Sequence, residues 1–538
     1  MTKTHAIGTF AAIGGLTATV ALLAGLPAAS ADELADLRAN QELLQRRIEQ
    51  LAQAPNVYRG GGAGLSPLGT AASPGAAMTA GSFPRSFLIP GTDTSIRVGG
   101  AATLKLEYWL QNGPTNGNTT SAGINGRVSS QPLDIHGQTV PGLTTPGSLV
   151  PVQIEHSRGN GVWQESSRET RLNVETRTPT SWGEARTFIE MDFSNANNFN
   201  QITQLHVADN LVPRLRYGYG TLGGFLAGQA NSNFSDPDAN AETVDFGGLV
   251  GQAGVVRIPQ VRYTIAGPWG SAWSMSLEAP ETDLLTPAGQ VQADSVNSAP
   301  PAGPGIITST QAGAVSCVAN GRVVSAAPCT LSGNPTKNPA PDITFASYWA
   351  QPWGHVDFRL VGRDLEVTDG RFISKRFFGY GGGISGDVKP GWFGWGKDDF
   401  QWQFTAGNGI GRYLNDGTDN ALATNFLSAP TTAAAARNII VKPISEFGAS
   451  VGYQHWWLPN LRSNISYGYA YYAVPSQLVG PFASLAAQKQ LMNTFINVIW
   501  SPVAFVDTGI EYTWGQRLVL ANIRGSEQAL VGVFRVKF

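Results

Sequence analysis

The last eleven residues, 528–538, read Q-A-L-V-G-V-F-R-V-K-F and separate apolar from charged side chains. In an extended strand, Phe534, Val536 and Phe538 fall on one face and Arg535 on the other, because side chains alternate along a strand. An amphipathic edge strand of a soluble sheet is one interpretation. A membrane-barrel strand is the other, with its apolar face toward lipid and its polar face toward a watery lumen. How often the pattern recurs decides between them.

The same alternation recurs along most of the chain. In residues 96–108, Val98 and Leu104 alternate with Arg97 and Lys105. We predict strands at residues 96–108, 171–177, 185–193, 211–220, 224–233, 257–266, 271–280, 342–350, 355–364, 376–386, 398–406, 445–455, 460–472, 490–500, 505–516 and 528–538. The sequence therefore predicts an all-β transmembrane barrel of about 16 antiparallel strands, spanning residues 86–538.

The connections between these strands alternate in length. Short turns such as residues 267–270 and 351–354 alternate with longer stretches, of which residues 281–341 are the longest. In membrane barrels the short turns are periplasmic and the long loops extracellular, and an even strand number puts both chain ends on one side. A barrel of this size leaves an aqueous lumen.

The N-terminus resembles an export signal. Lys3 precedes an apolar stretch, and Ala29 and Ala31 form a small-x-small cleavage site, so we predict a signal peptide over residues 1–31. An uncleaved membrane anchor is the alternative. Beyond this stretch, the sequence contains no apolar run of roughly 18 residues, the length that a membrane helix requires. We therefore expect the mature chain to reside in the bacterial outer membrane.

Residues 32–54 have the only strong helical pattern. Leu37, Leu44 and Leu51 fit the a and d positions of heptads, and Gln41 is the one polar a position. A helix this short is marginal alone in water, so we expect partner helices from other subunits in a periplasmic coiled coil. Packing on its own barrel, or plugging it, is the alternative. Residues 55–85, rich in Gly, Ala, Ser and Pro, form a predicted flexible linker.

The charge and the cysteines exclude several functions. A net charge of −2 argues against a nucleic-acid binder. Cys317 and Cys329 lie in one Ala/Pro/Gly/Ser-rich stretch, which in an exported protein predicts a disulfide in a surface loop. Two thiols without a neighbouring histidine leave a zinc site incomplete, so we expect no metal and no cofactor.

Arginines dominate the polar faces of the predicted strands. Arg and Lys rings in a pore favour anions, and the planar guanidinium matches a carboxylate. We predict that the constriction is lined by residues near mid-strand, with acids that oppose or pair with them: Arg171, Arg216, Arg262, Arg359, Arg462, Glu190 and Asp192. A structural role in a charge network is the alternative for each arginine.

Tryptophans cluster near the predicted strand ends. They are Trp109, Trp182, Trp269, Trp353, Trp456, Trp457, Trp500 and Trp514. This distribution is typical of the aromatic girdle of a membrane barrel. A carbohydrate-stacking path is the alternative.

Several short motifs resemble the DcaP-like family of trimeric outer-membrane porins. They include S-F-L-I-P-G-T-D-T-S-I-R-V-G-G at residues 86–100, P-R-L-R-Y-G-Y-G at 213–220 and H-W-W-L-P-N-L-R-S at 455–463, together with the terminal Phe. The resemblance implies a homotrimer, a periplasmic coiled coil, and passive uptake of small anionic solutes such as dicarboxylates. The Cys-containing loop departs from the pattern and leaves pore width and solute open.

Two other functions remain as alternatives to a diffusion porin with outer-membrane lipid around it. An outer-membrane enzyme such as a lipase needs a Ser/His site, and His206, His355 and His455 have no Ser partner in the pattern. We therefore expect no enzyme activity. An envelope tether would use the heptad helix to contact the cell wall.

Overall fold

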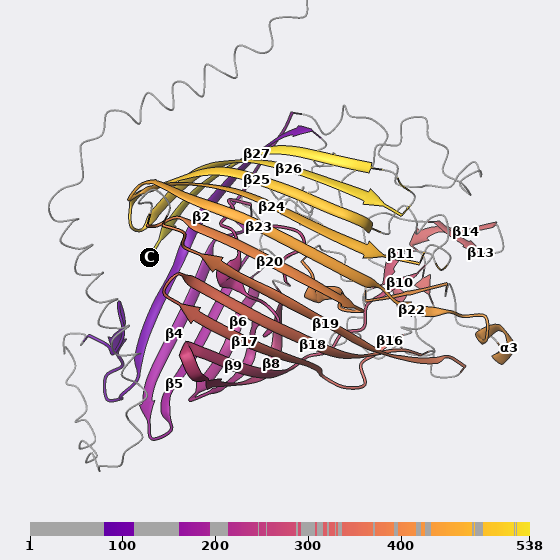
Figure 1. Cartoon of the computed structure of the whole chain (residues 1–538), viewed down its shortest axis with the longest axis horizontal. Helices are drawn as coiled ribbons and strands as arrows, with labels where there is room; N and C mark the ends of the chain where they lie inside the picture. The colour runs from indigo at the N-terminus through magenta and orange to yellow at the C-terminus, as the bar shows by residue number, and fades with distance from the viewer. Residues whose placement is uncertain are drawn as a thin grey trace, which may run out of the picture. The chain divides into compact units, whose positions relative to one another are not determined.

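Sixteen antiparallel strands close into a barrel in the computed structural model (Figure 1). The wall strands are β2 (Ser95–Gln111), β4 (Arg171–Thr180), β5 (Gly183–Asp192), β6 (Arg214–Leu222), β7 (Phe225–Asn231), β8 (Arg257–Ala266), β9 (Ser271–Glu278), β17 (Asp342–Gln351), β18 (Gly354–Thr368), β19 (Ser374–Val388), β20 (Asp399–Asn408), β23 (Ser445–Leu458), β24 (Leu461–Ala473), β25 (Gln488–Val503), β26 (Val506–Val519) and β27 (Arg524–Lys537). β2 pairs with β4 through Ile96 and Thr176, and with β27 through Leu104 and Phe534. The first and last wall strands therefore meet, and the ring is closed.

The structure describes residues 80–111, 161–193, 213–245, 247–253, 256–286, 336–368, 372–391, 396–415, 421–425, 432–475, 478, 488–520, 522 and 524–538, with short backbone pieces between 289 and 331. The predicted signal peptide, the predicted helix at residues 32–54 and most of the linker lie outside these residues. So does the predicted pairing of Cys317 with Cys329.

Several short elements lie between the wall strands or extend them. They are β1 (Phe87–Leu88), β3 (Val162–Ser166), η4 (Pro237–Ala239), η5 (Pro268–Gly270), β10 (Leu284–Thr286), β11 (Gly289–Val291), β12 (Ile307–Thr308), β13 (Ser316–Ala319), β14 (Arg322–Pro328), β15 (Thr330–Leu331), β16 (Thr336–Lys337), η7 (Gly411–Tyr413), β21 (Leu422–Thr424), α3 (Ala433–Ala436) and β22 (Val441–Pro443). β3 and β4 both pair with β2, β4 along its first part and β3 along its second part, so β3 and β4 together occupy one strand position in the wall. Among the described residues, no helix combines the length and apolar content needed to span a membrane.

The two faces of the wall carry different side chains, as predicted. On β2, Val98 and Leu104 are exposed on the outer face, whereas Lys105 and Glu107 are buried on the inner face. On β27, Phe534 is exposed and Val533 is buried. The period of two therefore sorts apolar side chains to the lipid face along the wall.

Both chain ends of the barrel lie at the end that carries the short turns. Residues 181–182, 223–224 and 459–460 are tight turns there, and the longest connection, residues 279–341, is at the opposite end. The predicted alternation of short and long is wrong at two connections. β18 ends at Thr368 and β19 begins at Ser374, so the connection between them is short. Only residues 520–523 connect β26 to β27. Both connections are short because these strands run past the predicted boundaries.

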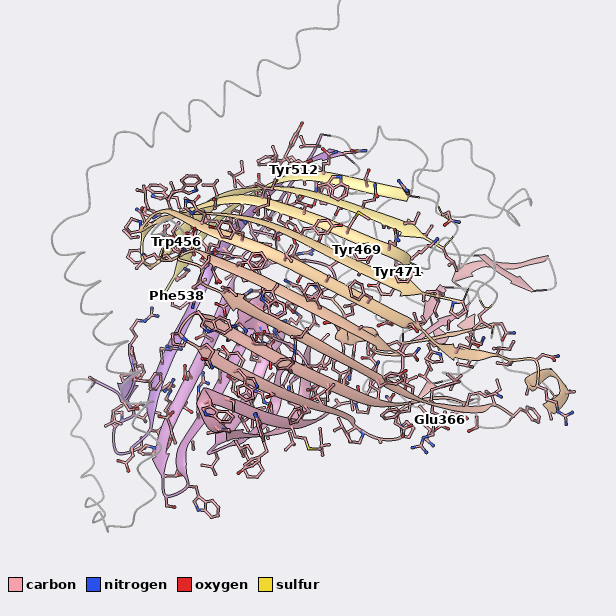
Figure 2. The ribbon with its side chains drawn as sticks, viewed as in Figure 1. Glu366, Trp456, Tyr469, Tyr471, Tyr512 and Phe538 are labelled. Atoms are coloured by element: carbon pink, nitrogen blue, oxygen red, sulfur yellow. The ribbon has the colours of Figure 1, made fainter. Side chains whose placement is uncertain are left out.

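Of the tryptophans predicted to form the girdle, Trp182, Trp269, Trp353 and Trp457 are exposed and lie at the short-turn end, as expected. Trp109 is an exception, because it is on the inner face of β2 and only 2% exposed, packed with Val244 and Val531. The girdle interpretation is wrong for this residue. Figure 2 shows the side chains around the wall, with Trp456 and the terminal Phe538 labelled at the end where the chain terminates.

Candidate functional site

Residues 232–253, between β7 and β8, fold against the inner face of the wall, and we name them the lumen segment. Arg359 Nη1 on β18 donates to the Phe234 carbonyl at 3.1 Å. Further along, Gln403 Nε2 on β20 donates to the Ala239 carbonyl at 3.1 Å. The lumen segment thus crosses the inside of the barrel from strand to strand, and it narrows the space that the wall encloses.

The far end of the lumen segment is held by one carboxylate on β26. The backbone N–H groups of Val244 and Asp245 each donate to Glu511 at 2.8 Å, and Asn497 Nδ2 donates to the same carboxylate at 2.9 Å. The ammonium of Lys105 on β2 lies 3.6 Å from Asp245. All of these side chains except the amide are charged and buried, so they cannot be pulled apart without leaving unpaired polar groups.

The near end is held by an aspartate between two wall strands. Asp236 faces His355 Nε2 on β18 at 2.9 Å and accepts a hydrogen bond from Ser385 on β19, while the other ring nitrogen of His355 contacts Asp387. Burial alone would raise the pKa of Asp236, but the bonds from His355 and Ser385 and the charge of Arg359 outweigh it and hold that pKa below its usual value.

The returning part of the lumen segment lies directly on the wall at positions that lack side chains. Gly251 has φ +78°, which favours glycine, and a Cβ there would approach the Tyr469 carbonyl to 2.0 Å. A Cβ at Gly468 on β24 would approach the Val250 carbonyl to 2.4 Å. Backbone therefore packs on backbone here, and Val250 also donates from its N–H to Asn493 Oδ1 at 3.1 Å.

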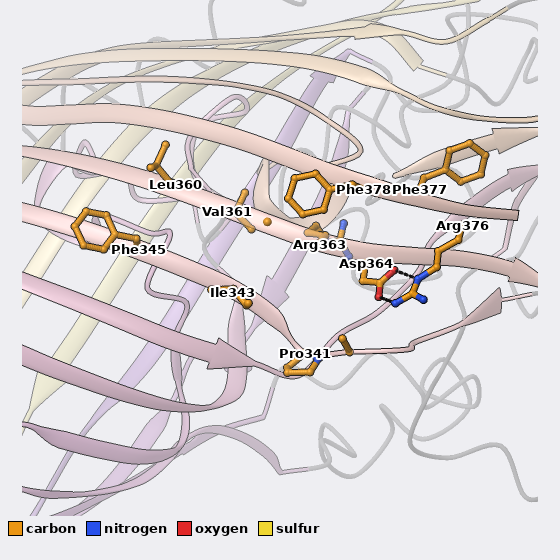
Figure 3. A pocket seen from close by; sticks show the side chains of 12 residues that line it. Pro341, Ile343, Phe345, Leu360, Val361, Arg363, Asp364, Arg376, Phe377 and Phe378 are labelled. Atoms are coloured by element: carbon orange, nitrogen blue, oxygen red, sulfur yellow. Dashed lines mark hydrogen bonds and ion pairs between the residues drawn. The ribbon is translucent and has the colours of Figure 1, made fainter.

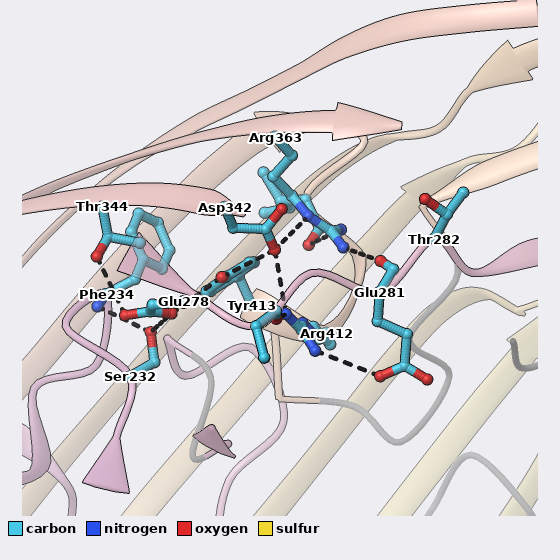
Figure 4. Close-up of polar contacts among 12 residues, drawn as sticks. Ser232, Phe234, Glu278, Glu281, Thr282, Asp342, Thr344, Arg363, Arg412 and Tyr413 are labelled. Carbon is cyan, nitrogen blue, oxygen red and sulfur yellow. Dashed lines mark hydrogen bonds and ion pairs between the residues drawn. The ribbon is translucent and has the colours of Figure 1, made fainter. Parts of the chain in front are cut away.

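A second infolded stretch follows β20. Figure 4 shows the hydroxyl of Tyr413, in η7, bonded to Glu278 at 2.9 Å and to Asp342 at 3.0 Å. Arg412 lies 3.1 Å from Asp342, and Arg363 on β18 donates to the Ile410 carbonyl at 2.9 Å. Burial, together with the two carboxylates, raises the pKa of Tyr413 well above its usual value, so the phenol stays a proton donor.

A basic strip runs along the part of the wall made by β2, β4 and β5. Three arginines converge on Glu175: Arg97 Nη2 at 2.6 Å, Arg177 Nε at 2.8 Å and Arg186 Nε at 2.7 Å. The carboxylate is only 1% exposed, whereas the three guanidinium groups are 17–32% exposed. Arg177 also lies 3.4 Å from the exposed Glu184, so three cations stand against two acids and one positive charge remains in excess at this part of the wall.

Phe83 packs beside this strip. Its ring centroid lies 4.5 Å from the Arg177 guanidinium carbon and 5.6 Å from that of Arg97, in cation–π geometry. The ring is 7% exposed, and Ser82 donates from its N–H to Ser95 Oγ at 2.9 Å. The residues that enter the barrel therefore fix the orientation of two arginines at the short-turn end.

The predicted acids and one predicted arginine form a second group, on β5 and β6. Arg216 Nε donates to Glu190 at 2.7 Å and its Nη1 to Asp192 at 2.8 Å. Arg214 forms a two-point pair with the same Asp192, at 2.9 and 2.7 Å. Arg216 is buried, and Arg214 is 36% exposed. Of the two arrangements that the sequence left open, opposing the arginines across the channel or pairing with them along the wall, the structure has these acids paired along the wall.

The other predicted constriction arginines separate into two kinds. Arg359 and Arg462 are buried against the lumen segment, and Arg462 binds Glu242 through Nε at 2.6 Å. Arg171 and Arg262 are half-buried on β4 and β8. Solute contact stays a prediction for all of them, and the positions of Arg359 and Arg462 favour the alternative role in a charge network.

The lumen segment itself is absent from the sequence-based predictions. Its acids Asp236, Glu242 and Asp245 stand in a connection between two strands, opposite the arginine-rich polar faces. Two features of the sequence could have indicated a segment folded into the lumen. One is the excess of acidic residues in this connection, and the other is the presence of Gly448 and Gly468 at inner-face positions of β23 and β24. The contacts at His355 and Glu511 have no local signal, since they join residues more than a hundred positions apart.

Two family models match parts of this chain. The Porin subfamily model matches residues 143–353, and the DcaP outer membrane protein model matches residues 438–538. No curated protein matches the chain.

Several solved structures are similar to this one. The outer membrane channel DcaP of Acinetobacter baumannii superposes with a TM-score of 0.56 and 18% identity, over 83% of this chain and 97% of that one. An anion-selective porin from Comamonas acidovorans gives a TM-score of 0.43 and 7% identity, over 83% and 100%. OmpT of Vibrio cholerae, folded in vitro, gives 0.42 and 8%, over 83% and 98%.

Proposed function

We propose that this chain is a DcaP-like porin of the bacterial outer membrane, and that small anionic solutes, dicarboxylates among them, diffuse passively through its lumen along the basic strip. The barrel fold predicted from the sequence is confirmed by the DcaP structure, and the two family models support the predicted recognition and outer-membrane location. The nature of the solute is our proposal.

The observation that carries the proposal is the convergence of Arg97, Arg177 and Arg186 on Glu175, with Glu184 as a second, more exposed partner of Arg177. A guanidinium keeps several N–H donors after it binds one carboxylate oxygen, and it presents them in a planar fork. A dicarboxylate could therefore exchange between neighbouring arginines with one carboxylate always paired.

Ion selectivity tests this proposal directly. We expect reversal potentials in a KCl gradient across planar bilayers to show anion preference, and we expect Arg177→Glu with Arg186→Glu to reverse it. Lys442→Glu, an exposed charge change on β22, is the matched control and should leave the selectivity unchanged. Cation preference of the unaltered channel would refute the proposal while leaving the barrel intact.

We also propose a homotrimer whose subunits meet through the predicted coiled coil at residues 32–54. The heptad pattern and the family resemblance support this proposal. Export through residues 1–31 and a disulfide between Cys317 and Cys329 belong to the same set of proposals. Mass spectrometry of the intact mature chain, with and without reductant, would test cleavage before Asp32 and the pairing together.

A further inference from the structure

Arg186 in the basic strip lies against two aromatic rings. Its guanidinium carbon is 5.6 Å from the ring centroid of Phe188 on β5 and 5.8 Å from that of Tyr219 on β6, within the distance of about 6 Å at which a ring attracts a cation. The two rings are 5.8 Å apart and are inclined at 44° to each other. The other two arginines of the strip both contact the ring of Phe83 in the same way. Each arginine of the strip therefore has an aromatic ring against it, in addition to the carboxylate that the three share.

The strand register places these rings beside the arginines on the inner face of the wall. Consecutive cross-strand neighbours on β2, β4, β5 and β6 are Arg97, Glu175, Phe188 and Tyr219. Residues that lie directly opposite each other on paired strands point to the same face, and Glu175 is buried on the inner face, so the whole row faces the lumen. The adjacent inner-face row contains the other two arginines, which are paired with each other. Both wall rings are half-buried.

A guanidinium that contacts a ring keeps its hydrogen-bonding capacity. Its five N–H donors lie in its own plane and point outward from its edges, whereas its two faces have no donor and stack readily on aromatic rings. In the strip, Glu175 holds one edge of each guanidinium, and a ring restricts the movement of the rest. The guanidinium groups are also partly exposed, so their remaining donors point in a defined direction that a solute in the lumen can reach.

Donors with a fixed direction favour a planar anion over a spherical one. A carboxylate accepts two parallel N–H bonds from one edge of a guanidinium, so its affinity depends on how that edge is oriented. If the edge is already held in place, binding costs less side-chain entropy. A halide ion accepts a donor from any direction, and its attraction to the strip follows the charge. The rings should therefore raise the affinity for carboxylates and leave the attraction for halides unchanged.

We propose that Phe83, Phe188 and Tyr219 are positioning residues of the solute path, which make the basic strip bind carboxylates more tightly than halide ions. The three rings act through the arginines that they contact, and their own chemistry with the solute is not required. This inference rests on the proposed function, because it takes the basic strip as the path of the solute. It adds a selection by shape to the selection by charge.

Single-channel recording of the full chain in planar bilayers, with potassium succinate added to KCl, tests this inference. The succinate concentration that halves the chloride current measures carboxylate affinity, and the reversal potential in a KCl gradient measures selection by charge. We expect Phe83→Leu and Phe188→Leu each to raise that concentration by about threefold, equivalent to about 0.7 kcal/mol, with an unchanged reversal potential. Phe188→Tyr keeps a ring and should keep the affinity. Phe378→Leu is the matched control, because this ring is 71% exposed on the outer face of β19, beside an apolar groove across β17 and β18 (Figure 3).

The two measurements separate this inference from the proposed function. Cation preference of the unaltered channel in KCl would refute the proposed function itself. An anion-selective channel in which succinate acts equally on both leucine variants and on the unaltered protein, or does not act at all, would overturn the inference alone. A loss of anion preference in the leucine variants would also overturn it, because the rings would then keep the charges in the lumen rather than orient their donors. Heat-modifiable gel migration confirms that each variant is a folded barrel.

Discussion

At the scale of single residues, Glu511 is the side chain that holds the far end of the lumen segment against the wall. It accepts two backbone N–H groups from the lumen segment, and a buried N–H that loses its acceptor costs about 1–3 kcal/mol. We expect Glu511→Ala to release Val244 and Asp245 and to give noisier single-channel currents of higher mean conductance. Glu511→Gln keeps only one of the two acceptor oxygens and places an NH2 donor at the other, so it should retain one of the two backbone hydrogen bonds and give an intermediate effect. Currents of Glu511→Ala equal to those of the unaltered protein would show that Glu511 does not hold the segment.

We expect the attachment of the near end of the lumen segment to depend on pH, because Asp236 holds it. Its pKa is held below the ordinary 3.8, so its contribution is complete above that value and is lost as pH falls through the lower, native pKa. The groups facing it are His355, Ser385 and Arg359. We expect channel currents recorded between pH 7 and pH 3 to become noisier only below about pH 4, as the carboxylate protonates.

A neutral variant tests the same argument without changing the pH. Asp236→Asn should show at pH 7 the noise that the unaltered channel shows in acid, and should change little on acidification. Asp238→Asn, two residues away and exposed, is the control and should keep the ordinary acid response. Noise that rises equally in Asp236→Asn on acidification would place the titrating group elsewhere.

The sequence predicted which face each charged residue occupies, because alternation along a strand determines it. It could not predict which inner-face residues stay exposed. Arg359 and Arg177 both lie on inner faces of the wall, yet the first is buried against Phe234 and the second borders open space. The difference comes from the lumen segment, whose path depends on contacts between distant parts of the chain.

At the scale of elements, strand prediction succeeded where period and turn residues agreed. Residues 257–266 match β8 at both ends, since Pro268 and two glycines follow it. The predicted strand 224–233 begins one residue before β7 and ends two residues beyond it, because Ser232 and Asn233 already turn inward to bond Glu278. The lumen segment has no regular alternation of apolar and polar residues, so local sequence patterns do not predict it.

The close packing of the lumen segment on β24 leads to a prediction at this scale. Gly468→Val places a branched side chain where even a Cβ would meet the Val250 carbonyl at 2.4 Å, so the segment must move off the wall. We expect a larger single-channel conductance and a looser barrier to large solutes in liposome-swelling assays. Gly532→Val is the control on the outer face, where the nearest atom would be 3.6 Å away. Unchanged solute size limits in Gly468→Val would show that the segment does not set the width.

At the scale of the whole molecule, the barrel is completed by its last residue. Gly100 and Phe538 exchange backbone hydrogen bonds at 3.1 Å, which extends the seam between β2 and β27 to the chain end. Open strand edges are not tolerated in lipid, so this seam matters more than an ordinary edge. We expect deletion of Phe538 to lower the yield of heat-modifiable barrel in the outer membrane, whereas Phe538→Tyr should retain it. Normal assembly of the deletion would show that the other pairs of the seam suffice.

We propose that assembly of several barrels depends on residues 32–54, whose heptad pattern predicts partners that one chain cannot supply. If the helix joins subunits, polar residues in its apolar seam should weaken the trimer while each barrel conducts as before, because the lumen is formed within one chain. We therefore expect Leu37→Asp with Leu44→Asp to lower the trimer fraction in light scattering of the detergent-solubilised protein. Glu42→Ala, outside the seam, should leave it unchanged. A full trimer in the double variant would assign assembly to the barrel walls, and a barrel that lost its conductance would assign the helix to the pore.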